Sequence, residues 1–321
     1  MTSTLDIVRA QEELTEAFLQ GDEARSLALL SQLGGNPREV RATLESMLKA
    51  ADARFRQAAA FGLGELGGAA STRRLEQQLA IEESRGDHDG ASVAEAITRA
   101  LGRLEEAGAR ASLVKRLERL AAGRPTPSEL YTVVYALWKR RHPELLPAVT
   151  RSLERLPLPA AGALRGLHVL LEKPPEELRA WVQDPSIPVE HKAQVLAVLE
   201  EDVPDALLPV LPAFVSTAHA LVSETSGLER TAGHYCECLL SVLLAHRERV
   251  LRALPSEALG TLRTVALRLL AATDPDCALR SAILLQHIGR PEDASNIEAH
   301  RPADPIAARA FDEATRALRR A

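Results

Sequence analysis

Imidazole and thiol side chains, both common zinc ligands, gather in one part of the sequence. His234, Cys236 and Cys238 follow one another closely, with His219 and His246 nearby. A zinc site needs four ligands that converge on one point. Successive residues of a helix turn by about 100°, so the two thiols of a Cys-x-Cys pair point about 200° apart. We therefore predict no metal site and interpret the cysteines as small side chains buried between helices.

The segment Gly62–Gly67 matches the glycine pattern G-x-G-x-x-G of dinucleotide-binding proteins. That pattern binds a pyrophosphate only where it follows a β-strand and opens a helix. Here no strand precedes the glycines, and they lie at the C-terminal end of a predicted helix, where the helix dipole repels anions. We predict that no dinucleotide binds, and we expect no other cofactor.

Asp87, His88 and Asp89 place two carboxylates beside an imidazole in a turn bounded by glycines. Such a group could serve as a general base or ligate a metal. A solvated turn in which Asp89 caps the following helix explains the same residues more simply. We assign no residue of this chain to catalysis.

Aromatic and basic side chains alternate between residues 131 and 141. They lie in a basic stretch, residues 109–155, which carries 10 basic and 4 acidic side chains. Cations that contact phosphates and rings that stack on bases would suit a nucleic acid, whereas the helical spacing of the aromatic residues also suits packing. We take six residues as the candidate partner-binding site: Tyr131, Tyr135, Trp138, Lys139, Arg140 and Arg141.

The composition indicates an all-α protein. Hydrophobic residues make up 46% of the chain and aromatic residues 3%, so the core is built from small and aliphatic side chains. Ala, Leu, Arg and Glu, which dominate the sequence, are strong helix formers. Glycines and prolines divide the chain into predicted helices at 4–20, 22–33, 37–50, 52–67, 69–84, 91–107, 109–121, 127–141, 144–156, 160–172, 175–183, 189–199, 204–222, 228–246, 256–272 and 275–288, with a final short helix or two.

One predicted helix carries clear start and stop signals. Asp52 is placed to cap its N-terminus, and Gly67 with Gly68 to end it. Its pattern is an aspartate, an apolar residue with an arginine, two alanines and then Gly-Leu-Gly-x-Leu-Gly. Val93–Leu104 repeats this pattern 38 residues downstream, and Asp276–Arg280 repeats its beginning. The pattern resembles the second helix of a HEAT repeat.

The resemblance to HEAT-repeat proteins implies an armadillo-type, right-handed α-solenoid of about seven to eight helix pairs, in which stacked pairs bury one another's apolar faces. It also implies that Asp52, Arg56, Asp276 and Arg280 form a structural ladder between neighbouring repeats. We expect one repeat domain over residues 1–321, made of a capping pair at 1–35, regular repeats at 36–155, irregular proline-rich repeats at 156–230, and C-terminal repeats with a cap at 231–321.

Net charge, cysteine content and targeting signals indicate the class of partner and the compartment that we expect. A net charge of −5 disfavours a general nucleic-acid binder. Three cysteines are too few for a disulfide framework and favour a reducing compartment. We see no signal peptide and no apolar run near the roughly 20 residues of a membrane span. We expect a bacterial, cytoplasmic protein with no membrane insertion.

These observations together predict a non-enzymatic scaffold or adaptor that binds another protein on the concave or charged face of the solenoid. Neither the identity of the partner nor the oligomeric state follows from the sequence. Two alternatives stay open. One is a nucleic-acid-binding protein of HEAT type that uses the basic stretch 109–155. The other is a HEAT-type enzyme such as a bilin lyase, which the resemblance also allows.

Overall fold

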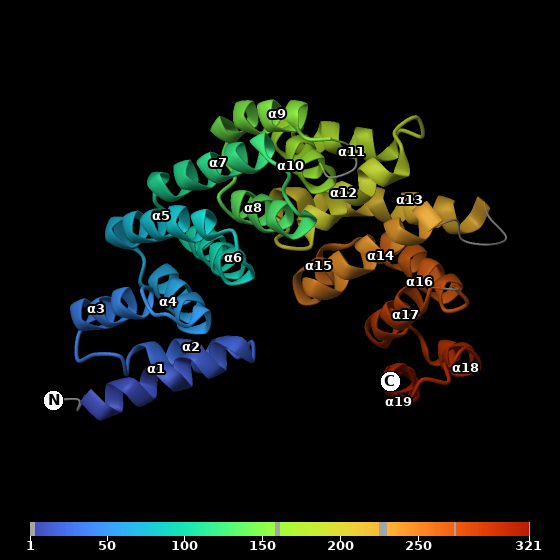
Figure 1. Ribbon diagram of the computed structural model, residues 1–321. Coiled ribbons are helices and arrows are strands. Elements are labelled where there is room, and N and C mark those ends of the chain that lie inside the picture. Colours follow the sequence, from blue (N-terminus) through green and yellow to red (C-terminus); the bar gives the residue numbers. More distant parts are fainter. Residues whose placement is uncertain (1–3, 158–160, 225–229, 273, 321) are drawn as a thin grey trace. The chain divides into compact units, whose positions relative to one another are not determined.

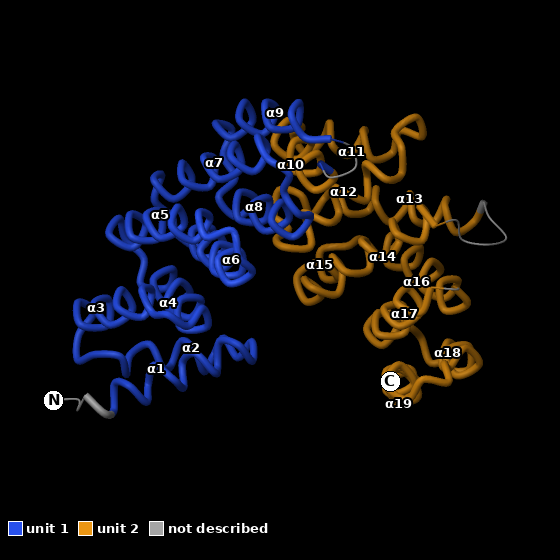
Figure 2. The backbone as a smooth tube through the Cα atoms, in the orientation of Figure 1, with its two compact units in different colours: residues 1–161 blue, residues 162–321 orange. Residues whose placement is uncertain are grey.

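The computed structural model describes residues 4–157, 161–224, 230–272 and 274–320 (Figure 1). Within these ranges it contains helices and no β-strand, which confirms the predicted all-α class. The chain divides into two compact units, residues 1–161 and 162–321 (Figure 2), and each is described by itself below. Whether the two units act as the single repeat domain that we expected stays a prediction.

Unit 1 consists of helix pairs whose bounds lie close to the predicted ones. The elements are α1 Thr4–Leu19, α2 Glu23–Leu30, α3 Pro37–Met47, α4 Ala53–Leu66, α5 Gly68–Arg85, α6 His88–Arg103, α7 Ala107–Ala122, α8 Pro127–Lys139, the 3₁₀ turn η1 Pro143–Leu145, and α9 Leu146–Arg155. The helices form two layers, since α4, α6 and α8 contact in succession on one side and α5, α7 and α9 on the other (Figure 1).

Unit 2 repeats the two-layer arrangement with shorter elements. These are α10 Gly162–Glu172, α11 Pro175–Gln183, α12 Val189–Leu199, the 3₁₀ turn η2 Asp205–Val210, α13 Leu211–Glu224, α14 Arg230–Ala245, α15 Arg247–Ala253, α16 Ser256–Leu269, α17 Pro275–Ile288, the 3₁₀ turn η3 Pro291–Asp293, α18 Ala294–Ala299 and α19 Pro305–Leu318. One layer runs through α10, α12, α14, α17 and α19, and the other through α11, α13 and α16.

Most helices of unit 2 lie close to the predicted ranges, but the predicted helix at 204–222 is divided into η2 and α13. The predicted helix starts at residues 160 and 228 lie outside the described residues. The separate helix α15 was not predicted, because the sequence around His246 has neither a glycine nor a proline to mark the break.

The segment that comprises η2 and most of α13 corrects one expectation. Asp205–Ser223 is 19 residues long and apolar enough to cross a membrane by length and composition, although we expected no such run. Pro209 lies within η2, so this part of the segment is a 3₁₀ helix and only the rest is α-helical. α13 packs on α14 and α16, which is the position of a core helix.

Helix α4 shows how the sequence produces the close packing. The carboxylate of Asp52 accepts the backbone N–H of Arg54 and caps the helix, as predicted. Gly67, with φ of +66°, ends α4 and is also the residue before α5, so a single residue joins the two helices. A Cβ on Gly64 would lie 3.1 Å from Cα of Ala100 in α6. The glycines of the G-x-G-x-x-G match therefore let helices touch and end a helix, as the position of the motif indicated.

The same close approach at a glycine recurs between α6 and α8 and, in unit 2, between α10 and α12. A Cβ on Gly102 of α6 would lie 2.9 Å from Cα of Ala136 in α8. In unit 2, a Cβ on Gly166 of α10 would lie 2.2 Å from the carbonyl oxygen of Gln194 in α12. In each case a helix backbone rests directly on the next helix, so only glycine fits.

Candidate functional site

The six residues of the predicted partner-binding site lie on α8 and just after it, but they are not equally accessible. Trp138 is 1% exposed and belongs to the core, whereas Tyr131 is 40% exposed. The rings of Tyr131 and Tyr135 pack at 5.8 Å between centroids. Lys139 is exposed at the end of the helix. Only part of the predicted site is therefore presented to solvent.

The two arginines after α8 contact the protein itself. Arg140 donates to the carbonyl oxygen of Leu104 at 3.0 Å, which ties it to the end of α6. The guanidinium of Arg141 lies 4.9 Å from the centre of the Trp138 ring and donates to the Trp138 carbonyl oxygen at 3.2 Å. Both side chains stabilise the C-terminus of α8. A partner-binding role for the six residues stays a prediction.

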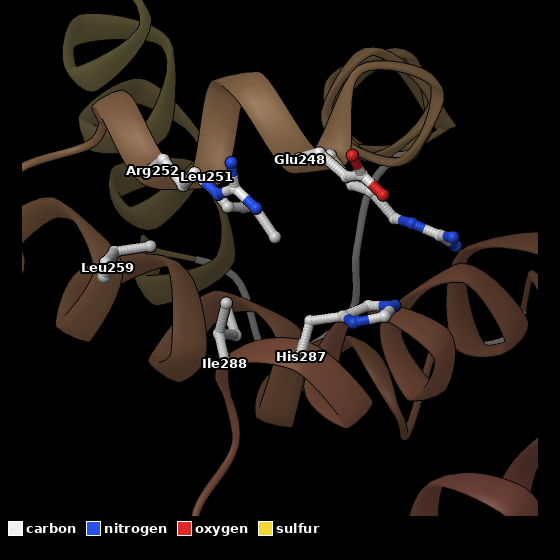
Figure 3. A pocket seen from close by; sticks show the side chains of 7 residues that line it. Glu248, Leu251, Arg252, Leu259, His287 and Ile288 are labelled. Atoms are coloured by element: carbon white, nitrogen blue, oxygen red, sulfur yellow. The ribbon is translucent and has the colours of Figure 1, made fainter.

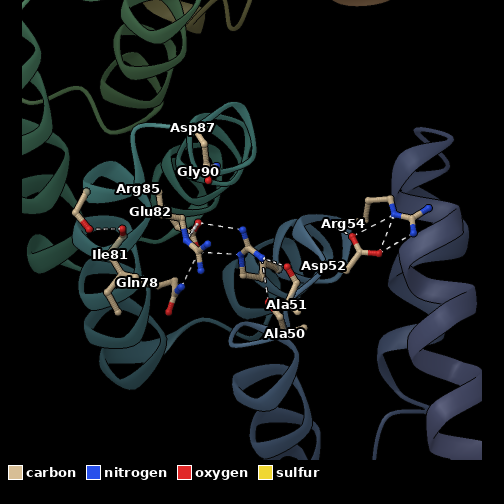
Figure 4. A network of polar contacts seen from close by, with 12 residues as sticks. Ala50, Ala51, Asp52, Arg54, Gln78, Ile81, Glu82, Arg85, Asp87 and Gly90 are labelled. Atoms are coloured by element: carbon tan, nitrogen blue, oxygen red, sulfur yellow. Dashed lines mark hydrogen bonds and ion pairs between the residues drawn. The ribbon is translucent and has the colours of Figure 1, made fainter.

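The predicted ladder residues of unit 1 separate into a cap and a buried ion pair (Figure 4). Asp52 pairs with Arg54 at 2.6 Å, and the hydrogen bond from the Arg54 side chain, followed by the one from its backbone, lowers the pKa of Asp52. Arg56 is buried and pairs with Glu82 of α5 at 2.9 Å. Figure 4 shows Asp52 and Arg54 apart from the group around Glu82.

The buried pair is held by several further hydrogen bonds. Arg56 also donates to the carbonyl oxygens of Ala50 and Ala51, at 3.0 and 2.7 Å. Glu82 also accepts from Gln78 at 2.7 Å and pairs with Arg85 at 3.1 Å. Because both charges are out of water, this network is the kind that costs most when one partner is removed.

The corresponding residues of unit 2 are arranged differently. Asp274, and not Asp276, is the N-cap of α17, and it accepts the backbone N–H of Asp276 at 3.0 Å. The sequence match to Asp52 is therefore displaced by two residues. Arg280 pairs with Glu237 of α14 at 3.2 Å, and both side chains are about one-third exposed. In both units the arginine contacts a glutamate of another helix.

The remaining sequence-based candidates are structural in their contacts. Cys236 and Cys238 are buried, and burial raises the pKa of each thiol to about 12. Such thiols are protonated at neutral pH and are poor nucleophiles and poor ligands. Among the described residues, no group of three or more His, Cys, Asp or Glu side chains could hold a metal ion. Asp87, and not Asp89, caps α6, and it accepts the backbone N–H of Gly90 at 2.6 Å.

A pocket of about 440 Å³ in unit 2 was not predicted (Figure 3). Side chains of α15 form one wall, and α16 and the last turn of α17 form the other. The lining residues are Arg247, Glu248, Leu251 and Arg252 from α15, Leu259 from α16, and His287 and Ile288 from α17. We name this the α15–α17 pocket. Its volume lies within the range of small-molecule sites.

Charge and apolar surface are combined in the α15–α17 pocket. Arg247 and Arg252 make no hydrogen bond or ion pair with any other residue that the structure describes. Three aliphatic side chains, Leu251, Leu259 and Ile288, line the same pocket (Figure 3). Partial burial, followed by the positive charge of Arg247, lowers the pKa of His287. The lowered pKa favours the neutral imidazole, and the charged side chains that line the pocket are two arginines and one carboxylate, that of Glu248.

No sequence pattern identifies the residues that line the α15–α17 pocket. Arg247 and His287 are 40 positions apart, on helices of different pairs. Arginine is abundant throughout the chain, so two more in α15 are no signal by themselves. Only the folded arrangement shows that these arginines lie beside aliphatic side chains and have no partner among the described residues.

Comparisons with known proteins address the architecture. No protein-family model matches the chain, and no curated protein sequence matches it. The chain is similar to the solved structure of human deoxyhypusine hydroxylase in complex with glycerol, with 16% identity and a TM-score of 0.39 over 89% of this chain and 98% of that one. It is also similar to the complex of CpcE and CpcF of phycocyanin lyase from Nostoc sp. PCC7120, with 17% identity and a TM-score of 0.36 over 87% of this chain and 94% of that one.

These findings correct one of our predictions. Both solved structures are of enzymes, a hydroxylase and a lyase, which contradicts the prediction of a non-enzymatic scaffold. At these identities the likeness concerns architecture, and the roles of individual residues must come from this chain itself. The fold of the chain is that of the HEAT-like helical solenoids.

Proposed function

We propose that this chain is an enzyme, or one subunit of an enzyme, that binds an anionic amphipathic ligand in the α15–α17 pocket. The observation that carries the proposal is the pair of arginines, Arg247 and Arg252, which flank aliphatic surface and lack a partner among the described residues. Guanidinium groups bind carboxylates through paired, charge-assisted hydrogen bonds.

The ligand class follows from this combination of side chains. A linear tetrapyrrole has a flat apolar body and two propionate carboxylates, so its body would lie on Leu251, Leu259 and Ile288 while its carboxylates meet the arginines. This is the ligand of the bilin lyases, the enzyme alternative that the sequence left open. His287, kept neutral by its surroundings, can donate or accept a hydrogen bond at the same ligand.

The test is a titration of the full-length protein with biliverdin, followed by the visible absorption of the pigment. We expect a saturable spectral shift, and the double variant Arg247→Ala/Arg252→Ala should bind about 100-fold more weakly, about tenfold for each charge-assisted contact. Arg38→Ala is the matched control, since Arg38 is an exposed arginine at the start of α3. No saturable shift, or equal binding by the double variant and the wild type, would overturn the proposal.

A protein partner belongs to the same proposal, because a lyase transfers its ligand to a protein. We propose that the partner contacts the exposed part of α8, where Tyr131 and Lys139 lie. Tyr131→Ala/Lys139→Glu should lose a partner that the wild type retains in affinity purification from the native host, with an unchanged melting temperature. Arg140 and Arg141 are left intact in this test because they stabilise the end of α8.

A further inference from the structure

Lysine is scarce in this chain, and one lysine is buried. Of the 39 basic residues, five are lysines, at positions 49, 115, 139, 173 and 192. Four of them are exposed or half-buried, whereas Lys192, in the first turn of α12, is 3% exposed. The sequence uses arginine almost everywhere else, so a lysine at a buried position is an unusual choice of cation. Lysine differs from arginine in that its amine can lose its proton and act as a nucleophile.

No carboxylate of the described residues forms an ion pair with the buried Lys192. Its Nζ donates to the backbone carbonyl oxygen of Asp184, at the end of α11, at 2.8 Å. The carboxylate of Asp184 is engaged elsewhere, because it accepts the backbone N–H and the hydroxyl of Ser186 at 2.8 and 2.7 Å. The carbonyl is the partner that the structure gives to Nζ, and a buried ammonium with one such partner is poorly stabilised.

The physical consequence is a shift toward the neutral amine. Burial lowers the pKa of Lys192, and the nearby charge of Asp184 opposes this shift only in part. A neutral amine has two N–H groups and a lone pair. If one N–H stays on the Asp184 carbonyl, the lone pair is available to another group.

Lys192 is one of the residues that line a cavity of about 360 Å³. The cavity lies between the turn from α11 to α12 and helix α13, entirely within unit 2, and it is distinct from the α15–α17 pocket. Its lining is mostly apolar and includes Ile187 and Val189 from the α11–α12 turn and the start of α12, and Ala220 and Leu221 from α13; Ser216 and Thr217 of α13 also line it. A cavity of this kind accepts a small, uncharged and largely apolar molecule.

We propose that Lys192 is a nucleophilic amine that forms an imine with an apolar aldehyde or ketone bound in this cavity. The lone pair of Nζ attacks the carbonyl carbon and a C–N bond forms, while one amine proton passes to the carbonyl oxygen to give a carbinolamine. The second amine proton then leaves with this oxygen as water, the hydrogen bond to the Asp184 carbonyl is lost, and the C=N bond remains. The step needs no oxidant or reductant. It goes beyond the function proposed above and uses none of its residues.

The test is reductive trapping on the full-length protein. Benzaldehyde is the probe and sodium cyanoborohydride reduces the imine to a stable amine, after which peptide mass mapping locates the adduct. We expect Lys192 to be labelled faster than each of the other four lysines at pH 7, since a lowered pKa raises the fraction of neutral amine. The rate at Lys192 should reach half its maximum at a lower pH than the rates at the surface lysines.

Two variants keep the test decisive. Lys192→Gln keeps an uncharged donor for the Asp184 carbonyl at this buried position, so it should fold with a similar melting temperature and lose the adduct. Arg247→Ala/Arg252→Ala removes the ligand contacts of the other pocket and should label normally at Lys192. Labelling of surface lysines but not of Lys192 in the folded protein would overturn the proposal. So would a rate at Lys192 with the pH dependence of an ordinary surface lysine.

Discussion

Units 1 and 2 have the same two-layer arrangement but differ in how neighbouring helices are connected. In unit 1, ion pairs join successive helices of the layer α3, α5, α7 and α9: Glu45 with Arg74, Glu76 with Lys115, Glu83 with Arg119 and Glu118 with Arg151. In the layer α11, α13 and α16 of unit 2, side chains instead donate to backbone carbonyl groups near the end of the neighbouring helix: Thr217 to Val182 and Arg268 to Val222.

This difference shows what an irregular repeat needs. A regular repeat places the same surface on each helix, so side chains can pair with side chains from one repeat to the next. Where helices are short and turns are rich in proline, the last carbonyl groups of a helix lack donors within the helix and accept hydrogen bonds from side chains instead. Thr217 and Arg268 make such bonds in unit 2. The two proposed sites, the α15–α17 pocket and the Lys192 cavity, both lie there.

The largest expected effect concerns the buried ion pair of unit 1. Arg56→Ala leaves the charge of Glu82 buried with fewer partners and should lower the free energy of unfolding by about 3–5 kcal/mol. The partly exposed pair of unit 2 gives the contrast, since Arg280→Ala should cost at most about 1 kcal/mol. Urea denaturation followed by circular dichroism measures both. Equal costs would remove this difference between the units.

A smaller effect is expected where backbones touch. Gly166→Ala places a Cβ against the Gln194 carbonyl and should cost about 1–3 kcal/mol, because α10 and α12 must move apart. Gly260→Ala is the control within unit 2. A Cβ at Gly260 meets nothing within 4 Å in the middle of α16, so this change should stabilise by about 0.5–1 kcal/mol. A stabilising Gly166→Ala would refute the close contact.

The surface ion pairs of unit 1 should contribute less. Lys115→Ala removes one partner of an exposed pair and should cost less than about 1 kcal/mol. In 1 M NaCl this cost should fall further, since salt screens exposed charges. A loss in the free energy of unfolding that is well above 1 kcal/mol and unaffected by salt would contradict this prediction.

The smallest effect is an acid sensitivity of unit 2. Burial lowers the pKa values of His191 and His287 below their ordinary value near 6.5. The unfolded chain therefore binds protons first as the pH falls below about 6.5, and stability decreases until the pH has passed the lowered pKa values. The double variant His191→Asn/His287→Asn should flatten this slope in denaturation curves from pH 7 to 4. An unchanged slope would assign it to other groups.

The sequence predicted the helices well because their signals are local. Asp52 and Gly67 mark the two ends of α4 by side-chain capping and positive φ, which depend on a few adjacent residues. One cap with a competing neighbour was misplaced by two residues, since Asp87 and Asp89 offer the same carboxylate. Only the packing of the helices decides between such alternatives.

The candidate sites could not be predicted in the same way. Trp138 has the spacing of a surface residue as much as of a core residue, and its burial depends on which face of α8 meets the neighbouring helices. The scarcity of lysine is visible in the sequence, but the burial of Lys192 depends on α13, about 25 positions away. Long-range packing determines both, and a local pattern does not encode it.

The single-residue joint at Gly67 has a mechanical consequence. α4 ends at Leu66 and α5 begins at Gly68, so only Gly67 and no flexible linker separates them. A pulling force on unit 1 would therefore pass from one helix to the next through two backbone torsions. We expect α4 and α5 to rupture together as one event in single-molecule stretching, whereas α6 and α7, joined through residues 104–106, can yield one after the other.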